Sequence, residues 1–378
     1  MTIQPLVALD LGATKVACAV GLPHERSRSF ELLGSSLTPY PLLSDTWLGD
    51  PLMVSRTIEQ ALEATAVHGE FSRAWVSAHP PFLTSEHVRV GIPLADEPAT
   101  VRAQDLKRLE RSALHQALGV DREPLLVERL GCSGNGFDGV RDPRGLSATR
   151  LMADFHLVAI PIASRRAIVQ AVESAGLEVV RLTYTLPAAL ASMAEERLTH
   201  QRVLLIDVGG LTSDVGLFVE GLLRDVAFLP WGGLKLAETI AKDLHVTMEQ
   251  AVTWSLEGTS CRKPEVRSHV ERHWALLQKA IEKVLHRQPQ PDAVLLTGRG
   301  TLMDGFAEWI ERTTGVSTSL CRSARTNQLG DLSRQVGVST AIGLLELVTS
   351  TTPAPLLRSP HLFNRLIDQT RVILTEYF

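Results

Sequence analysis

The stretch VALDLGATKVACAVG, from Val7 to Gly21, is the most informative part of this sequence. Two short apolar runs flank the turn GATK, a pattern typical of a β-hairpin. Gly12 lets the backbone approach a ligand closely, while Thr14 and Lys15 offer a hydroxyl and a cation to phosphate oxygens. Asp10, at the end of the first run, is suited to holding Mg²⁺ through water. On this stretch alone, a phosphate-binding turn and an ordinary solvated hairpin are equally good interpretations.

Two later stretches repeat parts of this design. VLLIDVGGLTSDVGLFVEG, Val203 to Gly221, again places an acid and a glycine turn between two apolar runs. Turns of this kind bind phosphate through successive backbone N–H groups. AVLLTGRGTLMDGFAEWIE, Ala293 to Glu311, predicts a strand, a glycine turn and an amphipathic helix, whose N-terminal end favours negative charge. The three in this order predict two similar lobes that face one phosphate chain.

Length and composition set broad limits. The chain has 378 residues, 44% of them hydrophobic, and a formal net charge of -4. This length predicts more than one domain, and the mild charge gives no indication of nucleic-acid binding. The four cysteines are scattered without a CxxC pair, so we expect reduced thiols rather than a zinc site. We expect neither a cleaved leader nor a bilayer-spanning helix.

The three segments resemble the phosphate-1, phosphate-2 and adenosine motifs of the actin, sugar-kinase and heat-shock-chaperone superfamily. The resemblance implies an α/β, actin-like two-lobed ATPase fold whose cleft holds ATP and Mg²⁺. It implies that Asp10 and Asp207 position Mg²⁺ through water. The nucleotide-binding residues that it implies are Gly12, Ala13, Thr14, Lys15, Gly209, Gly210, Leu211, Thr212, Gly233, Lys235, Glu238, Gly298, Arg299 and Gly300.

Some of these residues depart from the superfamily pattern. Leu211 stands where many relatives have a third glycine, and Arg299 replaces the second glycine of the adenosine pair. The guanidinium of Arg299 would either stack on the base or obstruct it. Where chaperones and actins carry a Glu or Gln that positions the attacking water, this chain has only Thr183, Tyr184 and Thr185. A hydroxyl is a poor base at neutral pH, so no catalytic residue is assigned and slow or undetectable ATP hydrolysis is expected.

The middle of the chain distinguishes among members of the superfamily. Sugar kinases start with a similar motif, but they commonly carry an Asn-Asp pair that this sequence lacks. The run DPRGLSATRL, Asp142 to Leu151, is similar to a run of the FtsA family of bacterial cell-division proteins. Proteins of the FtsA family carry an inserted subdomain called IC, and the pilus-assembly PilM family has the same insert. A PilM-like adaptor and a sugar kinase therefore remain the alternatives.

The FtsA resemblance implies the following domain boundaries. Subdomain IA covers residues 1–82 and 164–200, the latter with the connecting helix, and the inserted subdomain IC covers 83–163. Subdomain IIA covers 201–230 and 293–348, the latter including the return to IA, and IIB covers 231–292. A linker is expected at 349–361, and an amphipathic helix at 362–378.

The chain end has a pattern suited to a membrane interface. Behind a Thr/Pro-rich segment, apolar residues recur at helical spacing: Leu362, Phe363, Leu366, Ile367, Ile373, Leu374, Tyr377 and Phe378. A terminal helix docked on the body is the alternative interpretation of this stripe. FtsA-like proteins typically end in a linker and a membrane-targeting helix, which favours the membrane.

The resemblance also implies a function and partners. It implies a peripheral protein on the cytoplasmic face of the inner membrane at the division site, which polymerises and tethers FtsZ filaments. Later division proteins would contact subdomain IC, and the FtsZ C-terminal tail would bind subdomain IIB. A strongly basic helical stretch there offers Arg262, Lys263, Arg267 and Arg272 to an acidic tail.

Overall fold

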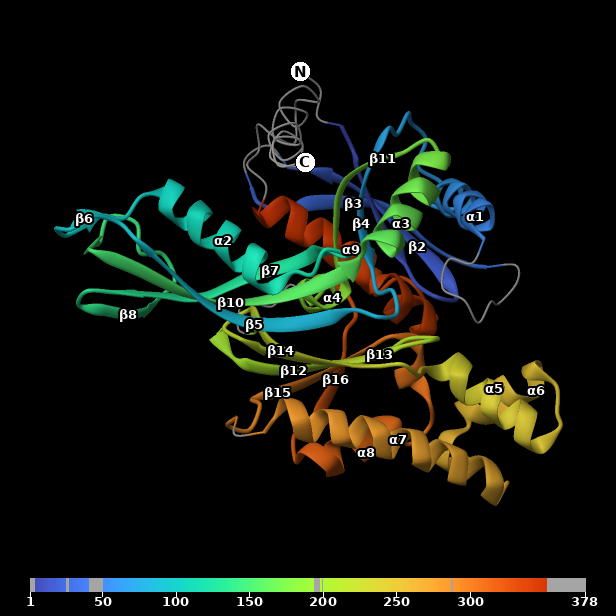
Figure 1. The fold of residues 1–378 in the computed structure, drawn as a ribbon. Coiled ribbons are helices and arrows are strands. Elements are labelled where there is room, and N and C mark those ends of the chain that lie inside the picture. Colours follow the sequence, from blue (N-terminus) through green and yellow to red (C-terminus); the bar gives the residue numbers. More distant parts are fainter. Residues whose placement is uncertain are drawn as a thin grey trace.

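The computed structural model describes residues 4–24, 27–40, 50–193, 198, 200–286 and 288–351. Two α/β lobes lie one above the other, and a third unit projects sideways from the upper lobe (Figure 1). We call the upper unit lobe one, the lower unit lobe two and the projecting unit the insert. Among the described residues, none of the helices has the length and apolar character needed to cross a membrane.

Lobe one is built on a five-stranded sheet in the order β11-β4-β1-β2-β3. Its strands are β1 (Leu6–Leu11), β2 (Lys15–Pro23), β3 (Phe30–Pro39), β4 (Arg73–Ala78) and β11 (Glu178–Tyr184). β1 pairs antiparallel with β2 and parallel with β4, so the predicted hairpin lies in the middle of the sheet. Its helices are α1 (Pro51–Glu63), α3 (Ile162–Ser174), α4 (Thr185–Ala191) and α9 (Leu332–Thr351).

The hairpin is buried on both faces of this sheet. Val7, Leu9 and Leu11 pack on the side covered by α1 and α3, whereas Ala8 packs against α9. Large and small residues alternate because successive side chains of a strand point to opposite faces. The small side permits a close approach of α9, which also packs directly on α4.

Lobe two repeats the sheet of lobe one. Its order is β14-β13-β12-β15-β16, with β12 (Arg202–Val208), β13 (Ser213–Val219), β14 (Leu222–Leu229), β15 (Ala293–Thr297) and β16 (Thr318–Leu320). β12 pairs antiparallel with β13 and parallel with β15, as β1 does with β2 and β4. The two similar lobes predicted from the repeated motif are therefore confirmed.

The helices of lobe two are α5 (Gly233–Leu244), α6 (Met248–Leu256), α7 (Pro264–Val284) and α8 (Phe306–Thr314), with the 3₁₀ turns η2 (Gly258–Ser260) and η3 (Arg299–Leu302). Trp274 of α7 stacks near Phe306 and Trp309 of α8 and helps to fill the core of this lobe. A further 3₁₀ turn, η4 (Ala324–Thr326), lies against lobe one, where Arg325 pairs with Glu346 of α9.

The insert has its own sheet and core. Its strands are β5 (Thr84–Pro93), β7 (Arg122–Gly134), β8 (Phe137–Val140) and β10 (Arg150–Pro161), in the order β5-β10-β7-β8. Helix α2 (Ala103–Ala117) packs on β5 and β10, and β6 (Ala99–Thr100) pairs with β9 (Ser147–Ala148). Leu109, Leu151 and Phe155 are fully buried between helix and sheet.

The sequence predicts a linker and then an amphipathic helix at the end of the chain, and the structure describes only the start of the linker region. Helix α9 continues through Thr351, so the first three residues of the expected linker at 349–361 are helical instead. Val348 and Thr349 are still buried, so the packed face of the helix extends past the expected boundary. The expected membrane helix at 362–378 lies outside the described residues.

Candidate functional site

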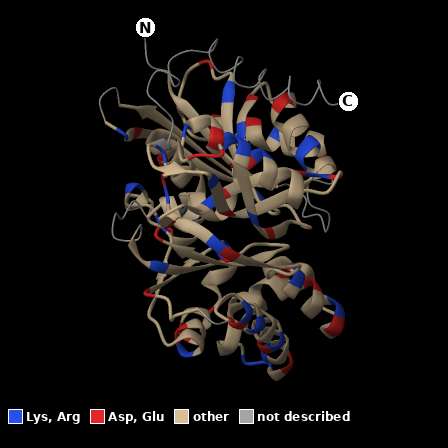
Figure 2. Ribbon diagram, turned by 60° about the vertical axis from the view of Figure 1, so that its left-hand side comes forward, with Lys and Arg blue, Asp and Glu red and all other residues tan. Residues whose placement is uncertain are grey.

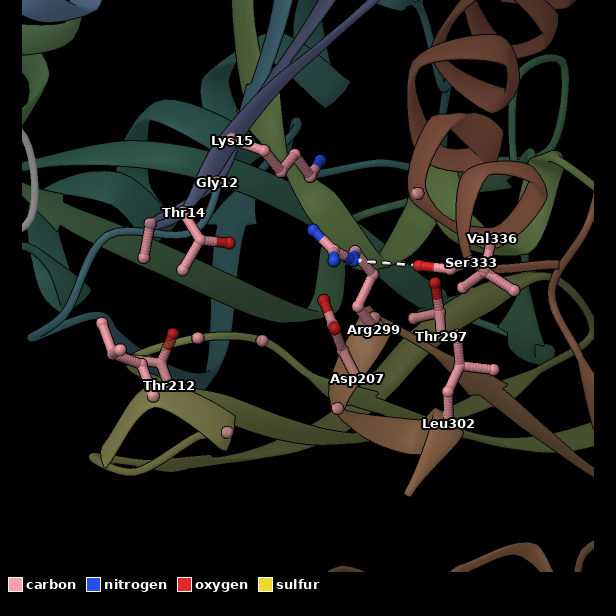
Figure 3. A pocket seen from close by; sticks show the side chains of 18 of the residues that line it. Gly12, Thr14, Lys15, Asp207, Thr212, Thr297, Arg299, Leu302, Ser333 and Val336 are labelled. Carbon is pink, nitrogen blue, oxygen red and sulfur yellow. Dashed lines mark hydrogen bonds between the residues drawn. The ribbon is translucent and has the colours of Figure 1, made fainter. Parts of the chain in front are cut away.

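A cavity of about 490 Å³ lies between the two lobes, and both hairpin turns line it. Figure 3 shows Thr14 of lobe one and Thr212 of lobe two on opposite walls. The lining of the cavity is uneven in polarity, and its two carboxylates, Asp10 and Asp207, belong to the strands that lead into the hairpin turns. Apolar side chains also line it, namely Leu234, Val252, Leu256, Leu302, Met303 and Val336.

The two hairpin turns have the same backbone geometry. The N–H of Gly12 donates to the carbonyl of Lys15 at 3.0 Å, and the N–H of Gly209 donates to the carbonyl of Thr212 at 3.0 Å. Each turn therefore follows a strand that ends near a carboxylate, Asp10 in lobe one and Asp207 in lobe two. The repeated motif of the sequence is a structural repeat as well.

The carboxylates are buried and close to further charges. Asp10 accepts from Ser77 Oγ at 3.0 Å and pairs with the ammonium of Lys15. Burial raises the pKa of Asp207 to about 7, and the neighbouring carboxylates of Asp214 and Asp10 contribute while His79 opposes. A divalent cation would relieve this unfavourable burial of negative charge. The donor set of carboxylate oxygens therefore fits Mg²⁺.

The third glycine turn closes the cavity from lobe two. Gly298 has a φ of 80°, and a Cβ there would lie 2.2 Å from Asp207 Oδ1 and 2.4 Å from the carbonyl oxygen of Val208. Only glycine allows this backbone to pass so close to the carboxylate. The second and third motifs therefore lie side by side in lobe two, as Gly298 and Asp207 show.

Arg299 reaches from this turn to the opposite lobe. Its Nε donates to Ser333 Oγ at 3.1 Å, and Ser333 lies in the first turn of α9 (Figure 3). The guanidinium is exposed and crosses the cavity rather than pointing into solvent away from it. Residue Arg299 therefore links lobe two to the last helix of lobe one.

Most of the predicted nucleotide residues line this one cavity. They are Asp10, Gly12, Ala13, Thr14, Lys15, Asp207, Gly209, Gly210, Thr212, Gly233, Gly298, Arg299 and Gly300. Leu211, Lys235 and Glu238 are not part of its lining. Leu211 is buried, and Lys235 Nζ pairs with Glu238 Oε2 at 2.9 Å on α5. These three departures arise because neighbouring residues of a turn or helix point in different directions.

The structure adds residues that the sequence did not indicate. His79, which follows β4, lines the cavity and lies 3.0 Å through Nε2 from Asp214 Oδ1. Tyr184 donates its hydroxyl to the other oxygen of Asp214. Thr185 lines the cavity, and its buried Oγ1 has no protein partner. The only sequence signal for His79 is its place at the end of a strand that pairs with β1.

The residues predicted to contact a protein tail lie on the outer side of lobe two. Arg262, Lys263, Arg267 and Arg272 are all exposed. Lys263 lies over the ring of Trp254 at 4.5 Å, and Arg272 contacts His269 at 2.8 Å. Figure 2 shows acidic residues interspersed with the basic ones along the helices of this lobe. The surface is therefore one of mixed charge, with a basic part at the start of α7.

Comparison with known proteins finds similarity to one kind of bacterial cell-division protein. Residues 82–159 match the SHS2 domain that is inserted in FtsA. The chain is 24% identical to cell division protein FtsA of Pseudomonas aeruginosa, covering 90% of this chain and 88% of that protein. It is 22% identical to FtsA of Escherichia coli K12, covering 90% of this chain and 89% of that protein.

Over about 90% of its length, this chain is similar to FtsA. The resemblance predicted from the sequence is confirmed, and the FtsA relatives support an actin-like role in cell division.

Solved structures with the same fold agree with the predicted fold class. A chain of a PilM-PilN type IV pilus biogenesis complex matches this chain with a TM-score of 0.69 at 14% identity. The match covers 92% of this chain and 99% of that one. MreB5 of Spiroplasma citri bound to ADP has a TM-score of 0.51 at 10% identity, and the match covers 91% and 96%. The predicted actin-like fold is confirmed.

Proposed function

We propose that this chain binds ATP with Mg²⁺ in the cavity between its lobes. The observation that carries the proposal is the pair of matching hairpin turns, each beside a buried carboxylate, that face one another across a single cavity. The turns at Gly12 to Lys15 and at Gly209 to Thr212 would hold the phosphates. The apolar wall that includes Leu256 and Met303 suits a nucleobase. The similarity of the fold to MreB5 bound to ADP supports a nucleotide as the ligand.

The chain's own residues would act mainly by positioning. Asp10 and Asp207 would hold Mg²⁺ through water, and the ion would supply positive charge to neutralise the phosphates. The two turns belong to different lobes, so a ligand that contacts both fixes the angle between the lobes. Arg299 already joins the lobes on the base side of the cavity. We therefore regard the nucleotide as a determinant of the shape in which the chain assembles.

The proposed cellular role is that of a division protein. The chain would polymerise on the cytoplasmic face of the inner membrane and tether FtsZ filaments there, assembling the division ring. The similarity to two FtsA proteins over 90% of the chain supports this role. Exposed basic residues at the start of α7, Arg262 and Lys263 among them, have the charge to bind an acidic FtsZ C-terminal tail. The insert would receive later division proteins.

Membrane attachment would depend on residues 362–378. Their apolar stripe resembles an interfacial helix, and many copies in one filament would convert weak single contacts into firm attachment. Co-sedimentation with liposomes tests this directly, comparing the full chain with a chain ending at Pro353. We expect the full chain to pellet with the lipid and the shortened chain to remain in solution. Equal pelleting of the two would contradict the membrane tether.

A PilM-like adaptor is the second candidate, favoured by the TM-score of 0.69 with the PilM-PilN complex. Such an adaptor would bind a short cytoplasmic peptide of an inner-membrane partner rather than the FtsZ tail. Titrating both peptides against the full chain, with fluorescence anisotropy as the readout, separates the two. A sugar kinase would instead release ADP faster when one particular sugar is added. No effect of a panel of hexoses on ADP release would remove that alternative.

A further inference from the structure

The cavity contains a buried polar cluster that the three glycine motifs do not include. It consists of His79, Tyr184, Thr212 and Asp214 and joins the two lobes: His79 and Tyr184 belong to lobe one, and Thr212 and Asp214 belong to lobe two. Asp214 is fully buried, accepts from the Tyr184 hydroxyl and lies 3.0 Å from His79 Nε2. His79 Nδ1 lies 3.2 Å from Thr212 Oγ1.

His79 and Thr212 are the members of this cluster that reach the ligand space. Both line the cavity, whereas Tyr184 and Asp214 lie behind them. Thr212 belongs to the turn whose backbone matches the Gly12 turn. The side chain of His79 is only 11% exposed, so its ring has few orientations open to it. The cluster thus presents the Thr212 hydroxyl, oriented by His79 Nδ1, at the phosphate part of the cavity.

The environment of His79 favours its charged form. Burial is the largest single influence and lowers the pKa of this imidazole, but the carboxylates around the ring, Asp214 foremost, together outweigh it and raise the pKa above its usual value. Asp207 and Asp10 act in the same direction from further away. The other cationic side chains in the cavity lining have partners of their own, since Lys15 pairs with Asp10 and Arg299 donates to Ser333.

We propose that His79, held by Asp214, forms with Thr212 a subsite for the terminal phosphate of a nucleoside triphosphate. An imidazolium whose Nε2 faces the buried carboxylate donates its Nδ1–H to Thr212 Oγ1, which leaves the hydroxyl hydrogen of Thr212 to be donated to a phosphate oxygen. A diphosphate lacks the group that this subsite binds. The subsite therefore distinguishes triphosphate from diphosphate, and it couples that distinction to the contact between the lobes. The inference rests on the proposed function of the cavity as a nucleotide site.

Calorimetric titration of the full chain with two ligands in the presence of Mg²⁺ tests the subsite. The ligands are ADP and the non-hydrolysable β,γ-imido analogue of ATP. We expect His79→Gln to weaken binding of the triphosphate analogue about tenfold and to leave ADP within about twofold. His68→Gln, at an exposed histidine of the same lobe, is the matched control and is expected to change neither. An unchanged ratio of the two Kd values in His79→Gln would overturn the subsite.

Tyr184→Phe separates phosphate binding from a structural role. It removes a donor to the same buried carboxylate but leaves His79 in place, so we expect a lower Tm with an unchanged ratio of Kd values. If Tyr184→Phe and His79→Gln change the ratio equally, the cluster acts only through the fold and the proposal is wrong. If the wild-type chain binds neither ligand, the proposed nucleotide function itself fails.

The dependence on pH supplies a further measurement on the wild-type chain, with His79→Gln as its control. The preference of the wild-type chain for the triphosphate should decline as the pH rises through the raised pKa of His79. The charged and titratable groups around the ring are Asp214, Tyr184, Asp207, Asp10 and Lys15. These groups are retained in His79→Gln, so a decline of equal size in that variant would assign the effect to them and overturn the proposal.

Discussion

Arg299 donates to Ser333 at 3.1 Å and so connects the third glycine turn of lobe two with the first turn of α9 in lobe one. The two residues are 34 positions apart in the sequence and approach from opposite sides of the cavity (Figure 3). A bond in this place restrains the separation of the lobes. Because the Arg299 side chain is held against Ser333, an arginine can replace a glycine of the adenosine motif and still leave the cavity open.

Removing the acceptor of that bond should speed the release of nucleotide. Ser333→Ala deletes the Oγ but keeps Arg299, and a net hydrogen bond of about 1 kcal/mol corresponds to a roughly fivefold rate change. We expect dissociation of a fluorescent ATP analogue to accelerate by about that factor, measured by stopped-flow chase. Ser268→Ala, at an exposed serine of α7, is the control. A dissociation rate equal to the wild-type rate would show that the bond does not restrain the lobes.

Gly298 should tolerate no side chain. Its φ of 80° and ψ of 146° lie in a region that other residues essentially never adopt, which costs about 1–3 kcal/mol. In addition, a Cβ would lie 2.2 Å from Asp207 Oδ1. We expect Gly298→Ala to lower the Tm and to weaken nucleotide binding more than tenfold.

Gly176→Ala is the matched control for that substitution. Gly176 also has a positive φ, 79°, but a Cβ there would meet nothing within 4 Å. It therefore carries the backbone strain without the collision, and we expect a lower Tm with normal nucleotide affinity. Calorimetry and thermal denaturation of both variants separate the two effects. Normal affinity in Gly298→Ala would contradict the assigned closeness of the turn to the phosphate site.

Asp207 should favour nucleotide binding but lower the stability of the nucleotide-free protein. It is 8% exposed, and the carboxylates of Asp10 and Asp214 lie near it, so Asp207→Asn removes an unfavourable buried charge. We expect the nucleotide-free variant to be more stable by about 1–2 kcal/mol in urea denaturation. Its nucleotide affinity should fall and should no longer respond to EDTA. Asp96→Asn, at an exposed site of the insert, should behave as the wild type in both measurements.

The sequence predicted the parts of the site that are local in the chain. Each hairpin turn is encoded within about fifteen residues, and its repetition predicted two lobes with one ligand between them. The contacts of His79 with Thr212 and Asp214 could not be predicted in this way, because they join residues more than 130 positions apart. The superfamily resemblance assigns Lys235 and Glu238 to the ligand, whereas in the structure their side chains pair with each other on α5. A motif predicts where the backbone turns better than where each neighbouring side chain points.

The contact between the insert and lobe two should weaken in acid. His156 of β10 is fully buried and contacts the carbonyl of Leu223 through Nδ1 at 3.0 Å, and burial lowers its pKa to about 4. In the unfolded chain the pKa is near 6.5, so the unfolded state binds the proton first as the pH falls. The resulting loss of stability begins near pH 6.5 and is complete near pH 4.

The size of that loss follows from the shift in pKa and amounts to roughly 3 kcal/mol. His156→Asn, which retains a side-chain donor, should lose stability on mutation but show a flatter pH dependence between pH 6.5 and 4. Urea denaturation at several pH values measures this. The exposed His115 of α2 offers the control His115→Asn. A pH dependence of wild-type steepness in His156→Asn would assign the acid sensitivity to other groups.

ATP hydrolysis by the purified protein should be slow or undetectable. Among the described residues that line the cavity, the groups near the phosphate turns are Asp10 and Asp207, assigned to Mg²⁺, the hydroxyls of Thr14, Thr185 and Thr212, and His79. A hydroxyl is a poor base, and the raised pKa of His79 favours an imidazolium, which has no lone pair to accept a proton from water. Phosphate release from the full chain, measured with and without liposomes, checks this expectation. A turnover of several ATP per second would show that a base acts in this cavity and would overturn both the slow-hydrolysis prediction and the charged state assigned to His79.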